Sequence, residues 1–117
     1  MRIDATVSEW QVGVHALAQE KGWYDGRSAA APREILANLM LVVSEIAEAA
    51  EEIRAGNVHD IYKDATGKPC GLPVELADAV IRILDTATWL GIDVEAAMMT
   101  KHMYNKTRPY KHGGKKA

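Results

Sequence analysis

A helical run between Pro32 and Ala55 constrains the fold more than any other stretch of this sequence. Its first half is apolar on nearly every side, because Met40, Leu41 and Val42 leave no continuous polar face. A helix of this kind must be covered on more than one side, by other helices or by a second chain. Its second half, EIAEAAEEIRAG, instead collects four glutamates within eight positions.

Proline and glycine divide the chain into four helical segments joined by polar loops. No stretch alternates between apolar and polar residues with a period of two, so we expect no β-sheet. The predicted fold is all-α: a four-helix bundle forming one domain over residues 1–117, with a basic, partly flexible tail from about residue 106. The helices are expected over residues 7–21, 32–55, 73–90 and 94–105.

Apolar side chains recur every three or four residues on the second and third segments, and we expect these two stripes to form the core. A chain of 117 residues buries only about two-thirds of its unfolded surface. A partner subunit is therefore expected to complete the core. The stripes are Leu36, Leu39, Val43, Ile46, Ala50 and Ile53, followed by Leu76, Val80, Ile83, Ala87 and Leu90.

Two carboxylate pairs lie opposite these stripes: Glu45 with Glu48, and Glu75 with Asp78. Residues three apart project from the same helix face, so antiparallel packing of the two helices brings all four carboxylates together. A solvated acidic surface is the alternative for either helix alone. Such a surface normally carries basic partners, and Arg82 is the only one on either line.

Four converging carboxylates repel one another unless a cation or protonation neutralises them. All-oxygen ligands select hard ions, which predicts Mg²⁺, with Mn²⁺ as a substitute. Zinc and a ferritin-like di-iron centre are disfavoured, because no ligand-spaced His or Cys accompanies the acids. Of the other two glutamates in the run, Glu52 is expected either to assist the metal ligands or to lie at the rim of the site, and Glu51 on the solvated surface.

The C-terminal tail is basic: six Lys/Arg and no acid follow from residue 101 onward. Lys101, Asn105 and Arg108 share one face of the last helix and are candidates to bind phosphate oxygens. A simpler explanation is that these cations complement the helix dipole. Lys115, next to a Gly-Gly pair, is a further phosphate candidate.

Aromatic side chains are candidates for stacking on a nucleobase. Core packing is the alternative role for each tryptophan, since the chain has no Phe. Trp89 lies on the same side of its helix as Glu75 and Asp78, which favours it as a binding residue. The candidates are Trp10, His15, Trp23 and Trp89.

The acidic motifs and the tail resemble those of the MazG-like all-α nucleotide pyrophosphohydrolases. The motifs are EIAE at 45–48 and ELAD at 75–78, and the stretches KPCGLPVELADAVIRILD and KHMYNKTRPYKHGGK are also similar. The resemblance covers residues 34–115 well and the first helix loosely. One departure is Ser44, where many members have a glutamate.

This resemblance implies Mg²⁺-dependent hydrolysis of a nucleoside triphosphate, often a deoxynucleotide, to the monophosphate and pyrophosphate. It makes Glu45, Glu48, Glu75 and Asp78 the metal ligands, with Glu48 a candidate to orient the attacking water. Lys101, Asn105 and Arg108 become catalytic candidates, of which the two cations stabilise the pyrophosphate leaving group. It also implies a homodimer or homotetramer whose site is completed by the second subunit.

Other features narrow the cellular context and leave alternatives open. Cys70 is the only cysteine, and no signal-peptide or membrane-spanning pattern is present, so we expect a cytoplasmic protein. No stable nucleic-acid partner is expected, because the body is acidic.

Two alternative functions remain besides the nucleotide pyrophosphohydrolase. One is a non-catalytic helical module that binds a partner or nucleic acid through the basic tail, and the other is a related phosphoribosyl-nucleotide hydrolase.

Overall fold

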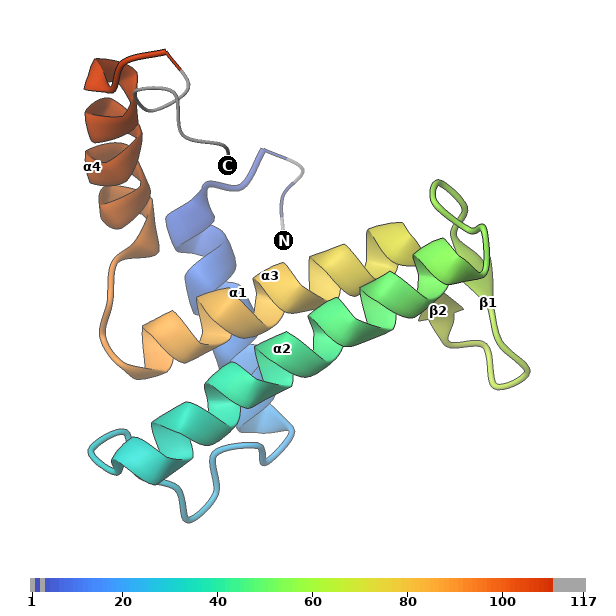
Figure 1. Cartoon of the computed structure of the whole chain (residues 1–117). Helices are drawn as coiled ribbons and strands as arrows, with labels where there is room; N and C mark the ends of the chain where they lie inside the picture. The colour runs from blue at the N-terminus through green and yellow to red at the C-terminus, as the bar shows by residue number, and fades with distance from the viewer. Residues whose placement is uncertain (1, 3, 111–117) are drawn as a thin grey trace.

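The computed structural model describes residue 2 and residues 4–110. Four helices follow one another along the chain: α1 (Val7–Glu20), α2 (Pro32–Arg54), α3 (Leu72–Trp89) and α4 (Val94–Thr107). The predicted all-α class is confirmed (Figure 1). In the described part of the chain, no helix has the length and hydropathy needed to cross a membrane.

The helices begin where local chemistry satisfies their first N–H groups. Thr6 and Glu9 form the predicted capping box of α1, with both side chain–backbone bonds at 3.1 Å. Pro32 is the first residue of α2, where its missing N–H removes no helical hydrogen bond. Asp93 accepts a bond from the Ala96 N–H at 2.9 Å and so caps α4.

Helices α2 and α3 lie side by side and antiparallel, and α1 packs across α3 on one side of this pair (Figure 1). This is the arrangement that brings the two acidic motifs together. Helix α4 extends away from the pair and has no buried residue. Its main neighbour is α1, through bonds from Ser8 to the Glu95 carboxylate at 3.1 and 3.3 Å.

A buried glutamine fixes the turn between α3 and α4. The Gln11 amide nitrogen donates to the Ile92 carbonyl, and its amide oxygen accepts from the Val94 N–H, both at 2.9 Å. One side chain on α1 thereby satisfies two backbone groups at the start of α4. The direction in which α4 leaves the body is set by this contact.

A short hairpin stands between α2 and α3, so the prediction of no β-sheet was wrong. Its strands are β1 (Tyr62–Lys63) and β2 (Pro69–Cys70), paired antiparallel. Asp64 organises the turn, since its Oδ1 accepts the backbone N–H groups of Thr66 at 2.8 Å and Lys68 at 3.1 Å. Strands of two residues are too short to leave an alternating pattern in the sequence.

The hairpin is tied to the helical body at both ends. The Tyr62 hydroxyl donates to Glu52 Oε1 at 2.7 Å, near the end of α2. Gly71, which leads into α3, has φ 115° and lies against the Asp60 carbonyl. A Cβ on Gly71 would stand 2.1 Å from that oxygen, so only glycine fits there.

Most of the predicted core stripes of α2 and α3 are not buried within the chain. Eight of their larger side chains are between 44% and 59% exposed, whereas Ala87 is buried, Leu90 is half-buried, and the buried positions of the two helices are small or polar apart from Leu84. Ala49 and Ala79 lie at the contact between the two helices, and Asn38, Glu45 and Glu75 are also buried. The exposed stripe residues, named here the α2–α3 apolar face, are Leu36, Leu39, Val43, Ile46, Ile53, Leu76, Val80 and Ile83.

The sequence identified two faces on each helix but assigned the wrong one to the interior of the single chain. Glu45, Glu48 and Asp78 lie on the side that α1 covers, where they line a cavity together with residues of α1. The stripes lie opposite them on both helices and so face away from α1. Hydrophobic periodicity alone does not tell which neighbour covers a stripe, another helix of the chain or a second copy.

We predict that Gly71→Ala destabilises the protein more than Gly67→Ala does. Both glycines have positive φ, 115° and 86°, so each alanine adds backbone strain of about 1–3 kcal/mol. Only the Gly71 Cβ meets backbone, because nothing lies within 4 Å of a Cβ at Gly67. Thermal denaturation measures the difference, and equal melting temperatures would contradict the close approach to Asp60.

Candidate functional site

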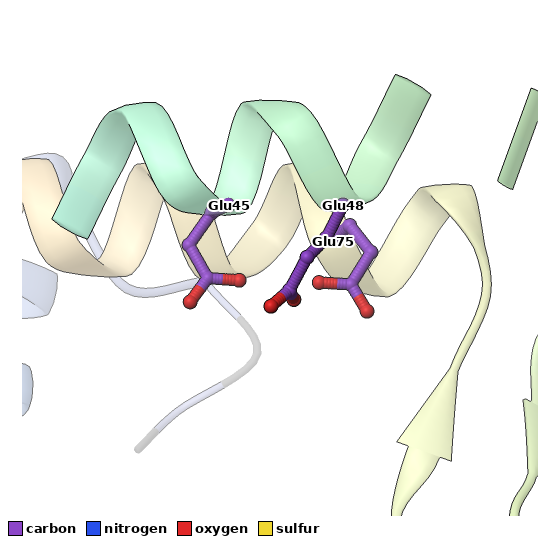
Figure 2. Close-up of side chains that lie close together, drawn as sticks. All are labelled: Glu45, Glu48 and Glu75. Atoms are coloured by element: carbon purple, nitrogen blue, oxygen red, sulfur yellow. The ribbon is translucent and has the colours of Figure 1, made fainter. Parts of the chain in front are cut away.

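Three glutamates from two helices converge at the centre of the molecule. Glu45 and Glu48 come from α2 and Glu75 from α3, and one carboxylate oxygen of each lies within 4.8 Å of the others. Figure 2 shows the three side chains pointing the same way from adjacent helices. Glu45 and Glu75 are only 7% and 6% exposed, while Glu48 is exposed. We name these three residues the acid cluster.

Two oxygens of the acid cluster are buried without a hydrogen-bond partner among the described residues: Glu45 Oε2 and Glu75 Oε2. The other oxygen of Glu45 accepts a bond from Arg82 Nε at 2.9 Å, which holds that carboxylate in place. Buried carboxylate oxygens without partners are costly in a folded protein. Their presence therefore indicates a missing cation or proton.

The raised pKa values of Glu75 and Asp78 also indicate that a proton or a cation compensates the carboxylates. Burial, followed by hydrogen bonds to Glu48 and Glu45, raises the pKa of Glu75 to about 7. Burial also raises the pKa of Asp78, and the Glu45 charge adds to this, while Arg82 and Lys68 oppose it. Asp78 is not part of the compact cluster but lines the same cavity. The predicted quartet is thus a trio with Asp78 beside it.

These residues fit a metal ion. A cluster of three acidic residues, two of them buried with unpartnered oxygens, supplies hard oxygen ligands at the right spacing. No His or Cys belongs to the group within the part of the chain that the structure describes. The absence of nitrogen and sulfur ligands favours an oxygen-preferring cation over zinc.

A cavity of about 630 Å³ opens beside the acid cluster, between α1, the α2–α3 pair and the hairpin. Its wall combines aromatic, apolar, acidic and basic side chains, which suits a ligand with an aromatic part and an anionic part. The aromatic residues are Trp10, Trp23 and Tyr24; the apolar ones include Leu17, Leu41 and Ile81; the acids are Glu45, Glu48, Asp78 and Asp85; the cations are Lys21, Arg27, Lys68 and Arg82.

A network of hydrogen bonds between side chains supports one part of the cavity wall. Asp85 is bonded to His15 Nδ1 at 2.7 Å and accepts the Tyr24 hydroxyl at 2.6 Å. The Asn38 amide donates to Tyr24 Oη at 3.1 Å and accepts from Arg27 at 2.7 Å. Burial and the bond to Asp85 raise the pKa of Tyr24 to about 12, so the hydroxyl keeps its proton. This network fixes the cavity wall.

The structure separates the predicted aromatic candidates. Trp10 and Trp23 line the cavity, and the Arg82 guanidinium lies 5.9 Å from the Trp23 ring centroid. His15 and Trp89 do not line it. They pack instead on Tyr24, each with ring centroids 4.9 Å apart, so they support the wall from behind.

The predicted phosphate-binding residues of α4 do not reach the cavity of their own chain. Lys101, Asn105 and Arg108 are absent from its wall. Lys101 and Arg108 flank the Tyr104 ring, at 4.9 and 6.0 Å from its centroid. Lys115 lies outside the described residues.

The remaining glutamates of the run behave as expected. Glu51 is exposed and paired with Arg54 on the surface, which confirms its assignment. Glu52 binds Tyr62 through one oxygen, and its other oxygen is buried without a partner near the hairpin. Glu52 therefore stands at the rim of the site.

Sequence reasoning missed several cavity residues. Lys68, Tyr24 and Arg27 come from loops, where no periodicity marks a face. Asn38 did carry a signal, because it is a lone polar residue inside the apolar run ILANLMLVV. A buried amide in such a run needs several partners, which Tyr24, Arg27 and Thr86 provide.

The fold and the site were compared with known proteins. No family model, no curated protein and no solved structure matches this chain. The chemistry of the site is therefore inferred from its own residues.

We predict that the metal-free protein loses stability as the pH rises from about 5 to about 7.5. The pKa of Glu75 is about 7 in the folded state against an ordinary value of 4.5, so the folded state holds the extra proton in this range. Ionising that group costs stability progressively between the two values. Melting temperatures in EDTA should fall as the pH rises, and Glu75→Gln should flatten this slope.

Glu75→Ala should likewise stabilise the metal-free fold, because it relieves the repulsion between carboxylates.

The matched control is Glu51→Gln, which changes an exposed glutamate paired with Arg54 on the same helix. This variant should keep the wild-type slope. A Glu75→Gln protein whose slope equals that of the control would show that the carboxylates do not repel one another as the geometry implies.

Proposed function

We propose that this protein is an Mg²⁺-dependent nucleoside-triphosphate pyrophosphohydrolase of the MazG-like type, with Mn²⁺ as a substitute ion. One observation carries the proposal: Glu45 and Glu48 line a cavity that also holds tryptophans and cations, and they share the acid cluster with Glu75, where one oxygen each of Glu45 and Glu75 is buried without a partner. A metal site beside an aromatic and cationic cavity suits a ligand with a nucleobase and a phosphate chain. The substrate is taken as a deoxynucleoside triphosphate, following the resemblance of the acidic motifs.

The reaction is hydrolysis at the α-phosphorus. Glu45, Glu48 and Glu75, with Asp78 beside them, would hold the ion, which when bound would neutralise phosphate charge and lower the pKa of a water. Glu48, as the exposed member of the acid cluster, takes the proton of the attacking water. A bond forms from the water oxygen to the α-phosphorus, the bond to the bridging oxygen breaks, and pyrophosphate leaves. Trp10 and Trp23 stack on the base in the cavity.

The active form is proposed to be a homodimer, or a dimer of such dimers, giving a MazG-like bundle. The α2–α3 apolar face supports this, because eight large side chains are about half exposed on one side of the helix pair. Soluble monomers rarely leave so large an apolar patch uncovered. Helix α4 extends away from its own site, so its cations Lys101 and Arg108, with Asn105, are proposed to act at the site of a second copy.

A non-catalytic binding module is the weaker candidate. The exposed cations of α4 would serve it, but it gives no reason to bury Glu45 and Glu75 beside a cavity. Placing these carboxylates away from water destabilises the fold unless a cation or a proton compensates them, and a cation site is what the hydrolase requires.

The direct test is turnover. The wild type, incubated with Mg²⁺ and each canonical deoxynucleoside and nucleoside triphosphate, should release monophosphate and pyrophosphate in equal amounts. Glu48→Gln should lower kcat by about 100-fold or more, the usual contribution of a general base. Glu51→Gln, an exposed neighbour, should keep wild-type kcat. Absence of turnover on every nucleotide, with Glu48→Gln matching wild type in metal binding, would reject the enzyme.

The oligomer has a separate test. Val43 is 54% exposed at the centre of the α2–α3 apolar face, and we predict that Val43→Glu gives a monomer in analytical ultracentrifugation. A charge in a buried apolar interface is strongly unfavourable. Val12→Glu, at an exposed α1 position with 66% exposure, should leave the wild-type dimer intact. A monomeric wild type would refute this assembly.

A further inference from the structure

We propose that Lys68, on the β1–β2 hairpin, binds the phosphate chain of the substrate within its own chain's site. This inference depends on the proposed function, which it extends by one substrate-contacting residue. Lys68 belongs neither to the acidic motifs nor to the basic tail, and its position in the fold is what makes it a candidate. It reaches the cavity from a loop that lies against the acid cluster.

The cavity wall contains four cations, and two of them are already engaged. Arg82 donates to Glu45, so its charge already compensates a carboxylate of the acid cluster. Arg27 donates to Asn38 and to the Glu34 carbonyl and packs over the Tyr24 ring. These contacts fix the position of both guanidinium groups, although each keeps N–H donors that the contacts do not use.

The other two cations, Lys21 and Lys68, make no side-chain hydrogen bond or ion pair among the described residues. They differ in position. Lys21 follows α1, next to Trp23 in sequence, on the aromatic part of the wall. Lys68 acts electrostatically on Asp78 and so stands beside the acids. Lys68 is therefore an uncommitted ammonium in the same cavity wall as Glu45, Glu48 and Asp78.

The backbone of Lys68 is held in place although its side chain is exposed. Its N–H donates to Asp64 Oδ1 at 3.1 Å, and its carbonyl accepts the Asp64 N–H at 3.0 Å. Tyr62 fastens the hairpin to Glu52, at the rim of the site. A fixed backbone with a free ammonium is suited to following a mobile phosphate chain.

The balance of charge between a triphosphate, a divalent ion and the acid cluster requires a further cation. A triphosphate carries three to four negative charges, and one divalent ion neutralises about half of them. The acid cluster adds further negative charge around the ion. An ammonium beside it donates charge-assisted hydrogen bonds to the phosphate oxygens and offsets the remaining repulsion. The α4 cations do not line this cavity within the chain, so Lys68 supplies from the same chain a charge that the proposed dimer adds to from the second copy.

The test compares Lys68→Met with Lys63→Met, a lysine on the opposite strand of the same hairpin that does not line the cavity. Binding of inorganic tripolyphosphate in the presence of Mg²⁺ is measured by calorimetry, since this probe requires no choice of base. Lys68→Met should weaken this binding about tenfold or more, the usual effect of losing one charged hydrogen bond. Lys63→Met should bind as wild type, and Lys68→Arg should recover part of the loss.

Mg²⁺ binding without phosphate separates this role from a structural one. Loss of a nearby positive charge cannot weaken the attraction of the acids for Mg²⁺, so Lys68→Met should bind Mg²⁺ at least as tightly as wild type. On any nucleotide that the wild type hydrolyses, kcat/KM should fall about tenfold or more in Lys68→Met alone.

Each result decides between the two proposals. Equal tripolyphosphate binding by Lys68→Met and Lys63→Met overturns the role of Lys68 and leaves the hydrolase standing. Wild-type protein that hydrolyses nothing overturns the hydrolase, while loss of tripolyphosphate binding in Lys68→Met still supports Lys68 as a phosphate contact. Weaker Mg²⁺ binding by Lys68→Met overturns its role as a direct phosphate contact, because the substitution would then have disturbed the acid cluster.

Discussion

The burial of carboxylates between two antiparallel helices governs the rest of this structure. Glu45 and Glu75 lose most of their contact with water, and the bond from Arg82 to Glu45 is the single ion pair to the acid cluster in the described residues. Like charges in such a place raise the free energy of the fold. The helices must therefore be held together by other contacts, and the acids must be compensated by protons or a cation.

Close packing of small residues supplies part of that support. Ala49 and Ala79 allow α2 and α3 to approach, which also brings the acidic motifs within a few ångströms of each other. Most of the larger apolar side chains lie on the opposite side of both helices, as the α2–α3 apolar face. The acids therefore face α1, together with Leu41 and Ile81, while an apolar surface faces outward.

Local features of the fold were predictable from the sequence, and relations between distant elements were less so. Thr6, Pro32 and Asp93 start helices through contacts with their immediate neighbours, which a sequence displays directly. The convergence of EIAE with ELAD followed from spacing and one packing assumption. The direction of the apolar stripes did not follow, because a helix with two distinctive faces can turn either one inward.

Loop residues were the hardest to predict. Lys68 reaches the cavity because Asp64 organises the turn of the short hairpin. Tyr24 reaches it because Asp85 and Asn38 hold its hydroxyl. Neither position belongs to a periodic pattern. Trp89 shows the limit of helix position: it shares a helix side with Glu75 and Asp78, but it packs on Tyr24, as His15 does, and neither lines the cavity.

The contact of Gln11 with the α3–α4 turn has a consequence for assembly. By bonding Ile92 and Val94, Gln11 restricts the angle at which α4 leaves the body before any second copy arrives. An arm that is already oriented loses little conformational entropy when it docks. In the proposed homodimer, docking of α4 would then resemble the joining of two rigid shapes, and the buried amide of Gln11 would affect the affinity without touching the second copy.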